Sequence, residues 1–118
     1  MGFIKPDKVI SPNKIWHLDF VLYDEGEGGF SVSCGRWDNQ KVVGLRWNGS
    51  NTPGSYLGNP QSSGHPTWFI VPKVLGIAII KELIFKNFMG NDSFRDVVIK
   101  KHYDWLKDFG CIDDSIYK

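Results

Sequence analysis

The sequence lacks a long apolar run. A membrane-spanning helix needs ~20 consecutive apolar residues, and Lys81 and Glu82 interrupt the most apolar segment well before that length. Residues 1–6 contain no apolar core of a secretory signal. They also carry Pro6 where a myristoylation signal requires Ser or Thr. These absences predict a cytoplasmic protein that does not engage a membrane.

Cysteine is scarce, and no metal-binding spacing is present. Cys34 and Cys111 lie far apart, which predicts neither a disulfide framework nor a zinc site. His65 has no second His, Asp or Glu at ligand spacing nearby. The acidic residues of 24–27 lack the ligand pattern of an EF-hand. We therefore expect no metal and no cofactor.

Basic residues are not in excess, since the formal net charge is +1 and the Lys and Arg residues are scattered. This distribution argues against a nucleic-acid partner. The glycines of 54–64 are not followed by the Gly-Lys-Ser/Thr of a phosphate loop. No Gly-x-Ser-x-Gly motif of a hydrolase nucleophile is present either.

Aromatic residues, by contrast, are abundant. They make up 14% of the 118 residues, with five Trp and eight Phe. A single small domain, the expectation at this length, does not easily hide so many rings in its core. Some of them are expected in a pocket or at an interface, where aromatic side chains are enriched.

The hydrophobic pattern predicts an α+β fold. Period-two alternation indicates strands over 15–23, 30–37 and 41–47, with a short fourth strand over 67–71. The expected architecture is a four-stranded, mostly antiparallel meander with two C-terminal helices packed on one face. Its parts are an extended lead-in over 1–13, the sheet over 14–71 with a long 48–66 loop, two helices over 72–109, and a tail over 110–118.

The first expected helix, residues 73–89, is apolar nearly all round. Such a helix must be covered on more than one side. Cyclic dimers are the most common oligomers. We therefore expect a homodimer, formed through the 73–89 helix or through exposed aromatic residues.

The 48–66 loop is the strongest indication of function. Long connections in small domains are commonly functional, and this one has too many aromatic and too few charged residues for a disordered linker. Trp47 and Trp68 are expected to anchor its two ends. We expect a non-enzymatic module that engages a small ligand or a protein partner. The predicted ligand-binding residues are Arg46, Asn48, Tyr56, Gln61, Ser63 and His65.

A small hydrolase-like enzyme is the alternative. His17 and Asp19 lie two apart on an expected strand, so they point to one face. If the first hairpin pairs its apolar faces, Ser31 and Ser33 join that face, and a Ser-His-Asp set is typical of nucleophilic catalysis. His65 is the other candidate base. The solvated face of an antiparallel sheet normally carries such residues without catalysis, so we expect no catalytic residues.

Two segments resemble a pattern in known sequences. They are Arg46-Trp47-Asn48-Gly49 and the run from Gly58 through Pro66-Thr67-Trp68-Phe69 to Pro72. They look like a group of short bacterial proteins of no established activity, some of them carried on mobile gene cassettes. The resemblance covers the third strand, the loop and the fourth strand. It implies a bacterial, cytoplasmic accessory protein and carries over no catalytic residues.

Overall fold

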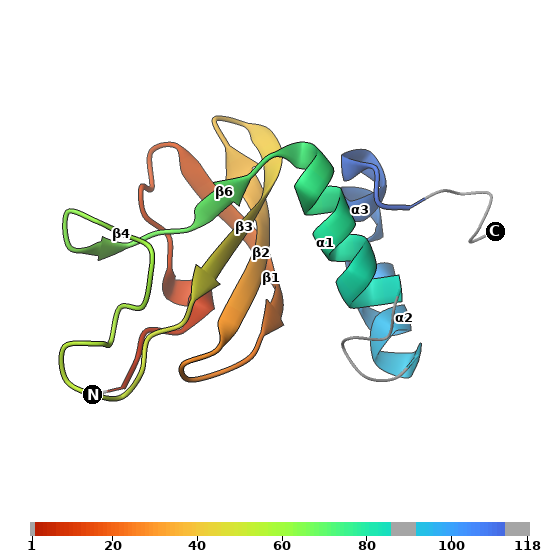
Figure 1. The fold of residues 1–118 in the computed structure, drawn as a ribbon. Helices are drawn as coiled ribbons and strands as arrows, with labels where there is room; N and C mark the ends of the chain where they lie inside the picture. Colours follow the sequence, from red (N-terminus) through yellow and green to blue (C-terminus); the bar gives the residue numbers. More distant parts are fainter. Residues whose placement is uncertain (1, 86–91, 113–118) are drawn as a thin grey trace. The chain divides into compact units, whose positions relative to one another are not determined.

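A computed structural model describes residues 2–85 and 92–112 of the chain. The chain divides into two compact units, residues 1–72 and 73–118 (Figure 1). The first unit contains an antiparallel sheet and the second is helical. The α+β fold class predicted from the hydrophobic pattern is therefore confirmed.

The sheet of the first unit has four strands in the order β1-β2-β3-β6, and every neighbouring pair is antiparallel. The four strands are β1 (Trp16–Asp24), β2 (Phe30–Trp37), β3 (Gln40–Trp47) and β6 (Phe69–Val71). Asp38 and Asn39 join β2 to β3 with φ of 51° and 67°. Two consecutive residues with positive φ form the tight turn that matches the twist of a hairpin, and Asp and Asn tolerate it well. The predicted meander is thus present.

Two bulges in β1 change which residues share a face. The pairing of β1 with β2 shifts between Leu18 and Phe20 and again between Val21 and Tyr23. At each shift two residues of β1 lie opposite one residue of β2, so the alternation of β1 is displaced by one. The period-two pattern of the sequence gives no sign of these insertions.

One face of the sheet is covered by the N-terminal lead-in. Val9, Trp16 and Trp68 form a buried cluster there, and the Trp68 indole Nε1 donates a hydrogen bond of 2.8 Å to the Val9 carbonyl. The lead-in is not wholly extended, because Pro6–Lys8 form a short 3-10 helix, η1. The lead-in thus helps to bury the rings of Trp16 and Trp68.

Two glycines make room for the tryptophan rings. A Cβ on Gly35 would lie 2.4 Å from the Trp16 ring and 2.4 Å from the His17 carbonyl. A Cβ on Gly44 would lie 2.9 Å from the Trp68 Cβ. All three distances are below van der Waals contact, so only glycine lets the aromatic cluster lie directly on β2 and β3.

The second unit contains α1 (Lys73–Phe85), α2 (Asp92–Lys101) and α3 (Tyr103–Phe109). The first expected helix begins after Pro72 as predicted, and its expected residues 86–89 lie outside the described part of the chain. The second expected helix is divided at His102, which has φ −119° and ψ 25°. No proline or glycine marks this break in the sequence. Gly110, with φ 99°, ends α3 as predicted.

Over residues 2–85 and 92–112, every helix falls short of the length and apolar character that a membrane crossing requires.

Candidate functional site

The 48–66 loop is held closed by backbone hydrogen bonds at its base. Trp47 and Asn59 exchange two of them, with N···O distances of 2.8 and 3.0 Å. Beyond Asn59 the chain forms a two-stranded hairpin, β4 (Gln61–Ser62) with β5 (His65–Pro66). The loop therefore has two parts, a wide turn over 48–59 and a narrow hairpin over 61–66.

Arg46 is a buried residue that contacts both sides of the loop. Only 3% of this residue is exposed, and its guanidinium donates hydrogen bonds to the carbonyls of Leu57 and Thr67. The guanidinium carbon also lies 5.8 Å from the centre of the Trp68 ring. Burial lowers the pKa of Arg46 to about 10, which still leaves it charged at neutral pH. Arg46 thus joins the end of β3 to both sides of the loop.

Asn48 ties the start of the loop to the β1–β2 hairpin. Its side-chain oxygen accepts a hydrogen bond of 2.7 Å from the Ser31 hydroxyl. Its Nδ2 donates to Asp24 Oδ1 at 3.0 Å and to the Gly26 carbonyl at 2.7 Å. Both hydrogens of the amide and its oxygen are therefore engaged within the protein, and the side chain acts in loop architecture.

The other predicted ligand-binding residues are more accessible. Tyr56 is half-buried, and its carbonyl accepts a hydrogen bond from the Ile4 N–H at 2.9 Å. Gln61 is exposed and donates to the Gly58 carbonyl at 2.8 Å. Ser63 and His65 are exposed on the β4–β5 hairpin, with Ser63 in the turn at φ 51°.

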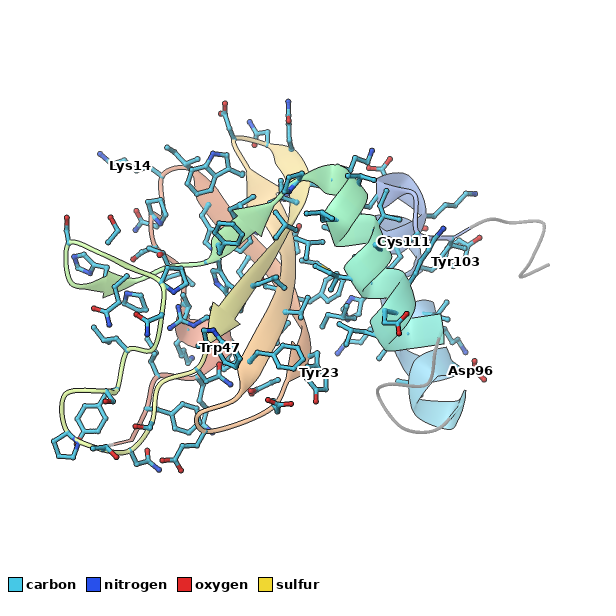
Figure 2. The ribbon with its side chains drawn as sticks, in the orientation of Figure 1. Lys14, Tyr23, Trp47, Asp96, Tyr103 and Cys111 are labelled. Atoms are coloured by element: carbon cyan, nitrogen blue, oxygen red, sulfur yellow. The ribbon has the colours of Figure 1, made fainter. Side chains whose placement is uncertain are left out.

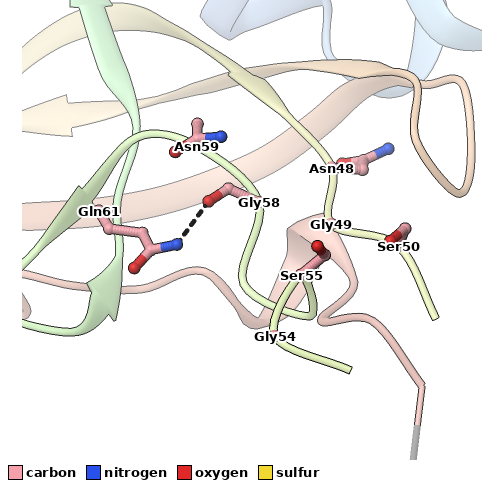
Figure 3. A pocket seen from close by; sticks show the side chains of 8 residues that line it. All are labelled: Asn48, Gly49, Ser50, Gly54, Ser55, Gly58, Asn59 and Gln61. Carbon is pink, nitrogen blue, oxygen red and sulfur yellow. Dashed lines mark hydrogen bonds between the residues drawn. The ribbon is translucent and has the colours of Figure 1, made fainter. Parts of the chain in front are cut away.

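The wide turn borders an open polar pocket of about 330 Å³ (Figure 3). Its walls are amide side chains, hydroxyl side chains and glycine backbone, with no ionisable side chain among them. The lining residues are Asn48, Gly49, Ser50, Gly54, Ser55, Gly58, Asn59 and Gln61. We call this the loop pocket.

Gly58 shapes the inner wall of the loop pocket. Its φ is +66°, and a Cβ there would lie 2.2 Å from the Trp47 carbonyl, 2.6 Å from the Gly49 nitrogen and 2.7 Å from Arg46 Nη2. Only glycine meets both conditions at once. The loop pocket and the buried guanidinium are thus separated by a single glycine.

A second hollow, of about 570 Å³, lies between residues 11–15 and the narrow hairpin. Residues 11–15, at the end of the lead-in and just before β1, line one side. Ser62, Ser63 and His65 of the narrow hairpin, with Thr67 after it, line the other. We call this the hairpin pocket. Its two sides are about fifty positions apart in the sequence.

The six predicted site residues therefore do not form one site. Asn48 and Gln61 line the loop pocket, Ser63 and His65 line the hairpin pocket, and Arg46 and Tyr56 line neither. Sequence reasoning missed Ser50, Ser55 and Asn59 of the loop pocket, although their position in the glycine-rich turn could have indicated them. Nothing in the pattern indicated that residues 11–15 face the hairpin.

The expected role of Trp47 is wrong. It was to anchor one end of the loop, but 60% of Trp47 is exposed, and its ring makes an edge contact with Phe30 at 6.5 Å between centroids (Figure 2). The backbone of Trp47 holds the loop through Asn59, while its neighbour Arg46 supplies the buried side chain. The expected anchoring by Trp68, which is 6% exposed, is confirmed.

The Ser-His-Asp arrangement of the alternative hypothesis is not formed. His17 Nε2 lies 3.5 Å from Asp19, but Asp19 is engaged by the Arg36 guanidinium at 3.1 Å. His17 pairs with Arg36 across the strands, and Ser31 and Ser33 are an odd number of positions from Arg36. The two serines therefore lie on the opposite face and are buried. The sequence misled because the apolar faces of the two strands do not pair as assumed: the register places His17 on the face of Arg36, Cys34 and Val32.

No group of three or more His, Cys, Asp or Glu side chains that could hold a metal is found within residues 2–85 and 92–112. Cys34 and Cys111 are both buried and form no disulfide, and burial raises the pKa of Cys111 to about 11. Comparisons with protein-family models, curated proteins and solved structures gave no match to this chain. The resemblance to short bacterial proteins accordingly stays a prediction.

Proposed function

We propose that this chain is a small binding module whose loop pocket takes a neutral, polar small molecule. The observation that carries the proposal is the lining of the pocket, which offers amide, hydroxyl and backbone groups and no ionisable side chain. Groups of this kind both donate and accept hydrogen bonds. They suit a ligand rich in hydroxyl or amide groups, such as a monosaccharide or a small amide.

The size and fixed shape of the pocket support this proposal. Its volume of about 330 Å³ falls in the range of about 300–1,000 Å³ typical of small-molecule sites, which are usually preformed. The Asn48 hydrogen bonds fix one side, and the Ser50 N–H to Ser55 carbonyl bond of 2.8 Å fixes another. A ligand would then lose little free energy in ordering the protein.

Some polar groups of the pocket remain available to a ligand. Among the described residues, the Ser55 hydroxyl and the Asn59 side-chain amide make no hydrogen bond within the protein. Gln61 uses its Nε2 on the Gly58 carbonyl and keeps its side-chain oxygen free (Figure 3). All three groups belong to the 55–61 arm of the loop and line the same pocket.

A blocking substitution tests the loop pocket. Titration of panels of neutral monosaccharides and small amides, followed by amide chemical shifts, is expected to move resonances of residues 48–61. Ser55→Phe fills the pocket with a large side chain and is expected to weaken the binding of the best compound at least tenfold. Thr52→Phe adds the same ring at an exposed position that does not line the pocket and should leave binding unchanged. Equal binding by both variants would contradict the proposal.

Self-association remains a proposal with a separate basis. Val74 and Leu75 at the start of α1 are 73% and 52% exposed, and large exposed apolar residues in adjacent positions favour an interface. Sedimentation of the full chain at rising concentration is expected to show a dimer. The double variant Val74→Ser, Leu75→Ser should shift it toward monomer, whereas Lys81→Ser, Glu82→Ser, also exposed in α1, should not. A monomer at all concentrations would refute it.

His65 is the candidate that remains for the hydrolase alternative, because His17 and Asp19 do not lie beside Ser31 or Ser33. No serine or cysteine nucleophile is seen hydrogen-bonded to His65 among the described residues. No observation favours catalysis over binding at this position.

A further inference from the structure

The hairpin pocket is separate from the proposed binding site. It shares no lining residue with the loop pocket, and one of its walls comes from the lead-in segment that precedes β1. Figure 2 shows Lys14 on that segment. A ligand in the loop pocket would therefore not account for the hairpin pocket.

Both walls of the hairpin pocket are held in place by the fold. The Pro12 carbonyl accepts hydrogen bonds from the N–H groups of Ile15 and Trp16, at 3.1 and 2.8 Å. The opposite wall is fixed by the Ser62–His65 strand pairing and by a 3.0 Å bond from the Thr67 N–H to the Pro60 carbonyl. Trp68, next to Thr67, joins the two walls through its bond to the Val9 carbonyl. The hollow is therefore a built feature of the first unit.

The lining combines positive charge with hydroxyl groups. Lys14 and His65 are its ionisable side chains, and no carboxylate lines it. The Lys14 ammonium has three donors, and an imidazole donates from at least one nitrogen in either protonation state. Ser62, Ser63 and Thr67 add hydroxyl donors on the same wall as His65. A negatively charged group is the chemistry that such donors recognise best.

The lining also offers apolar surface. Pro12 and Ile15 belong to it, and Ile15 is 45% exposed, although aliphatic side chains of this size are usually buried. Covering this surface with an apolar group would remove it from water. An inorganic anion would leave it uncovered.

We propose that the hairpin pocket binds a small organic carboxylate, with the anionic group toward Lys14 and His65 and a short apolar body over Pro12 and Ile15. The carboxylate accepts hydrogen bonds from the two basic side chains and from the hairpin hydroxyls. The apolar body of the ligand covers the exposed surface of Ile15. This site is independent of the loop pocket, so either proposal can fail without the other.

The test is a titration of the full chain with cyclohexanecarboxylate, read from backbone amide resonances. Saturating shifts are expected at residues 11–15 and 62–67. Two matched probes separate the contributions: cyclohexanecarboxamide keeps the body without the charge, and acetate keeps the charge with almost no body. Each of these two probes is expected to bind roughly tenfold more weakly than cyclohexanecarboxylate, which corresponds to a loss of about 1.4 kcal/mol of binding free energy.

Two charge-matched variants complete the experiment. Lys14→Gln is expected to weaken binding of cyclohexanecarboxylate about tenfold, a loss of roughly 1.4 kcal/mol. Lys8→Gln removes an equal charge from exposed η1, outside the pocket, and is expected to change binding less than twofold. His65→Gln is expected to weaken binding as well, without changing the spectrum of residues outside the hairpin.

Several outcomes would overturn the proposal. Equal affinity for the carboxylate and its amide would show that charge plays no part. Equal losses in Lys14→Gln and Lys8→Gln would indicate nonspecific attraction. Shifts confined to residues 48–61 would place the ligand in the loop pocket instead.

Discussion

Replacing Trp68 with alanine is expected to destabilise the first unit by about 3–5 kcal/mol, the usual cost of removing a large buried aromatic side chain. Three interactions disappear together. The ring packs against Trp16 at 6.4 Å between centroids, its Nε1 holds the Val9 carbonyl, and its face receives the Arg46 guanidinium. The measurement is urea denaturation followed by circular dichroism and by amide resonances of the first unit.

Trp47→Ala is the matched control for Trp68→Ala. Both residues flank the same loop, but Trp47 is largely exposed, and surface substitutions usually change stability by only about 0.5 kcal/mol. We expect Trp47→Ala to lose little stability, with a small added loss from removing the edge contact with Phe30. If the two variants were equally destabilised, the assignment of Trp68 as the sole tryptophan anchor would be wrong.

Arg46→Met is expected to cost on the order of 3 kcal/mol, because methionine fills similar space but cannot donate hydrogen bonds. The carbonyls of Leu57 and Thr67 would lose their donors, and a buried acceptor without a partner costs about 1–3 kcal/mol. Relief of the buried charge offsets part of this cost. Urea denaturation measures the loss, and amide hydrogen exchange at Trp47 and Asn59 reports whether the loop opens.

Two variants test whether the geometry of Arg46 or its charge matters. Arg46→Lys keeps the charge, but a single ammonium replaces the planar fork, so most of the loss should remain. Arg36→Met removes a half-exposed arginine paired with Asp19, and such pairs contribute only about 0–1 kcal/mol. Full stability in Arg46→Lys would show that charge alone holds the loop. Equal losses at positions 36 and 46 would contradict the central role of Arg46.

Much of the fold could be predicted from local pattern. Alternating Val, Ser, Cys and Leu residues predicted β2 and β3, whose pairing is regular from Phe30↔Trp47 to Trp37↔Gln40. The Asp38-Asn39 turn and the helix ends at Pro72 and Gly110 follow from residues with restricted or unusual backbone angles. Each of these signals acts within a few residues, which is why a single sequence suffices to find them.

The candidate site could be predicted only in part. The glycine-rich turn correctly indicated a long loop with accessible Gln61, Ser63 and His65. Arg46 and Asn48, which look like ligand-binding residues in the sequence, are buried and hydrogen-bonded to other parts of the first unit. Their partners lie 11–24 positions away along the chain. A polar side chain beside a loop has the same appearance in sequence whether it faces a ligand or a distant carbonyl.

The sequence by itself determined the α+β class, the meander and the position of the loop, because periodicity and turn residues are local properties. Tertiary structure alone decided three further points. The register of the first hairpin placed His17 opposite Arg36, on the face away from Ser31 and Ser33. The lead-in covered one face of the sheet and formed one wall of the hairpin pocket. The Trp47–Asn59 bridge divided the loop into a wide turn and a narrow hairpin, which line different pockets. Each depends on contacts between residues far apart in the chain, whose energies no local pattern records.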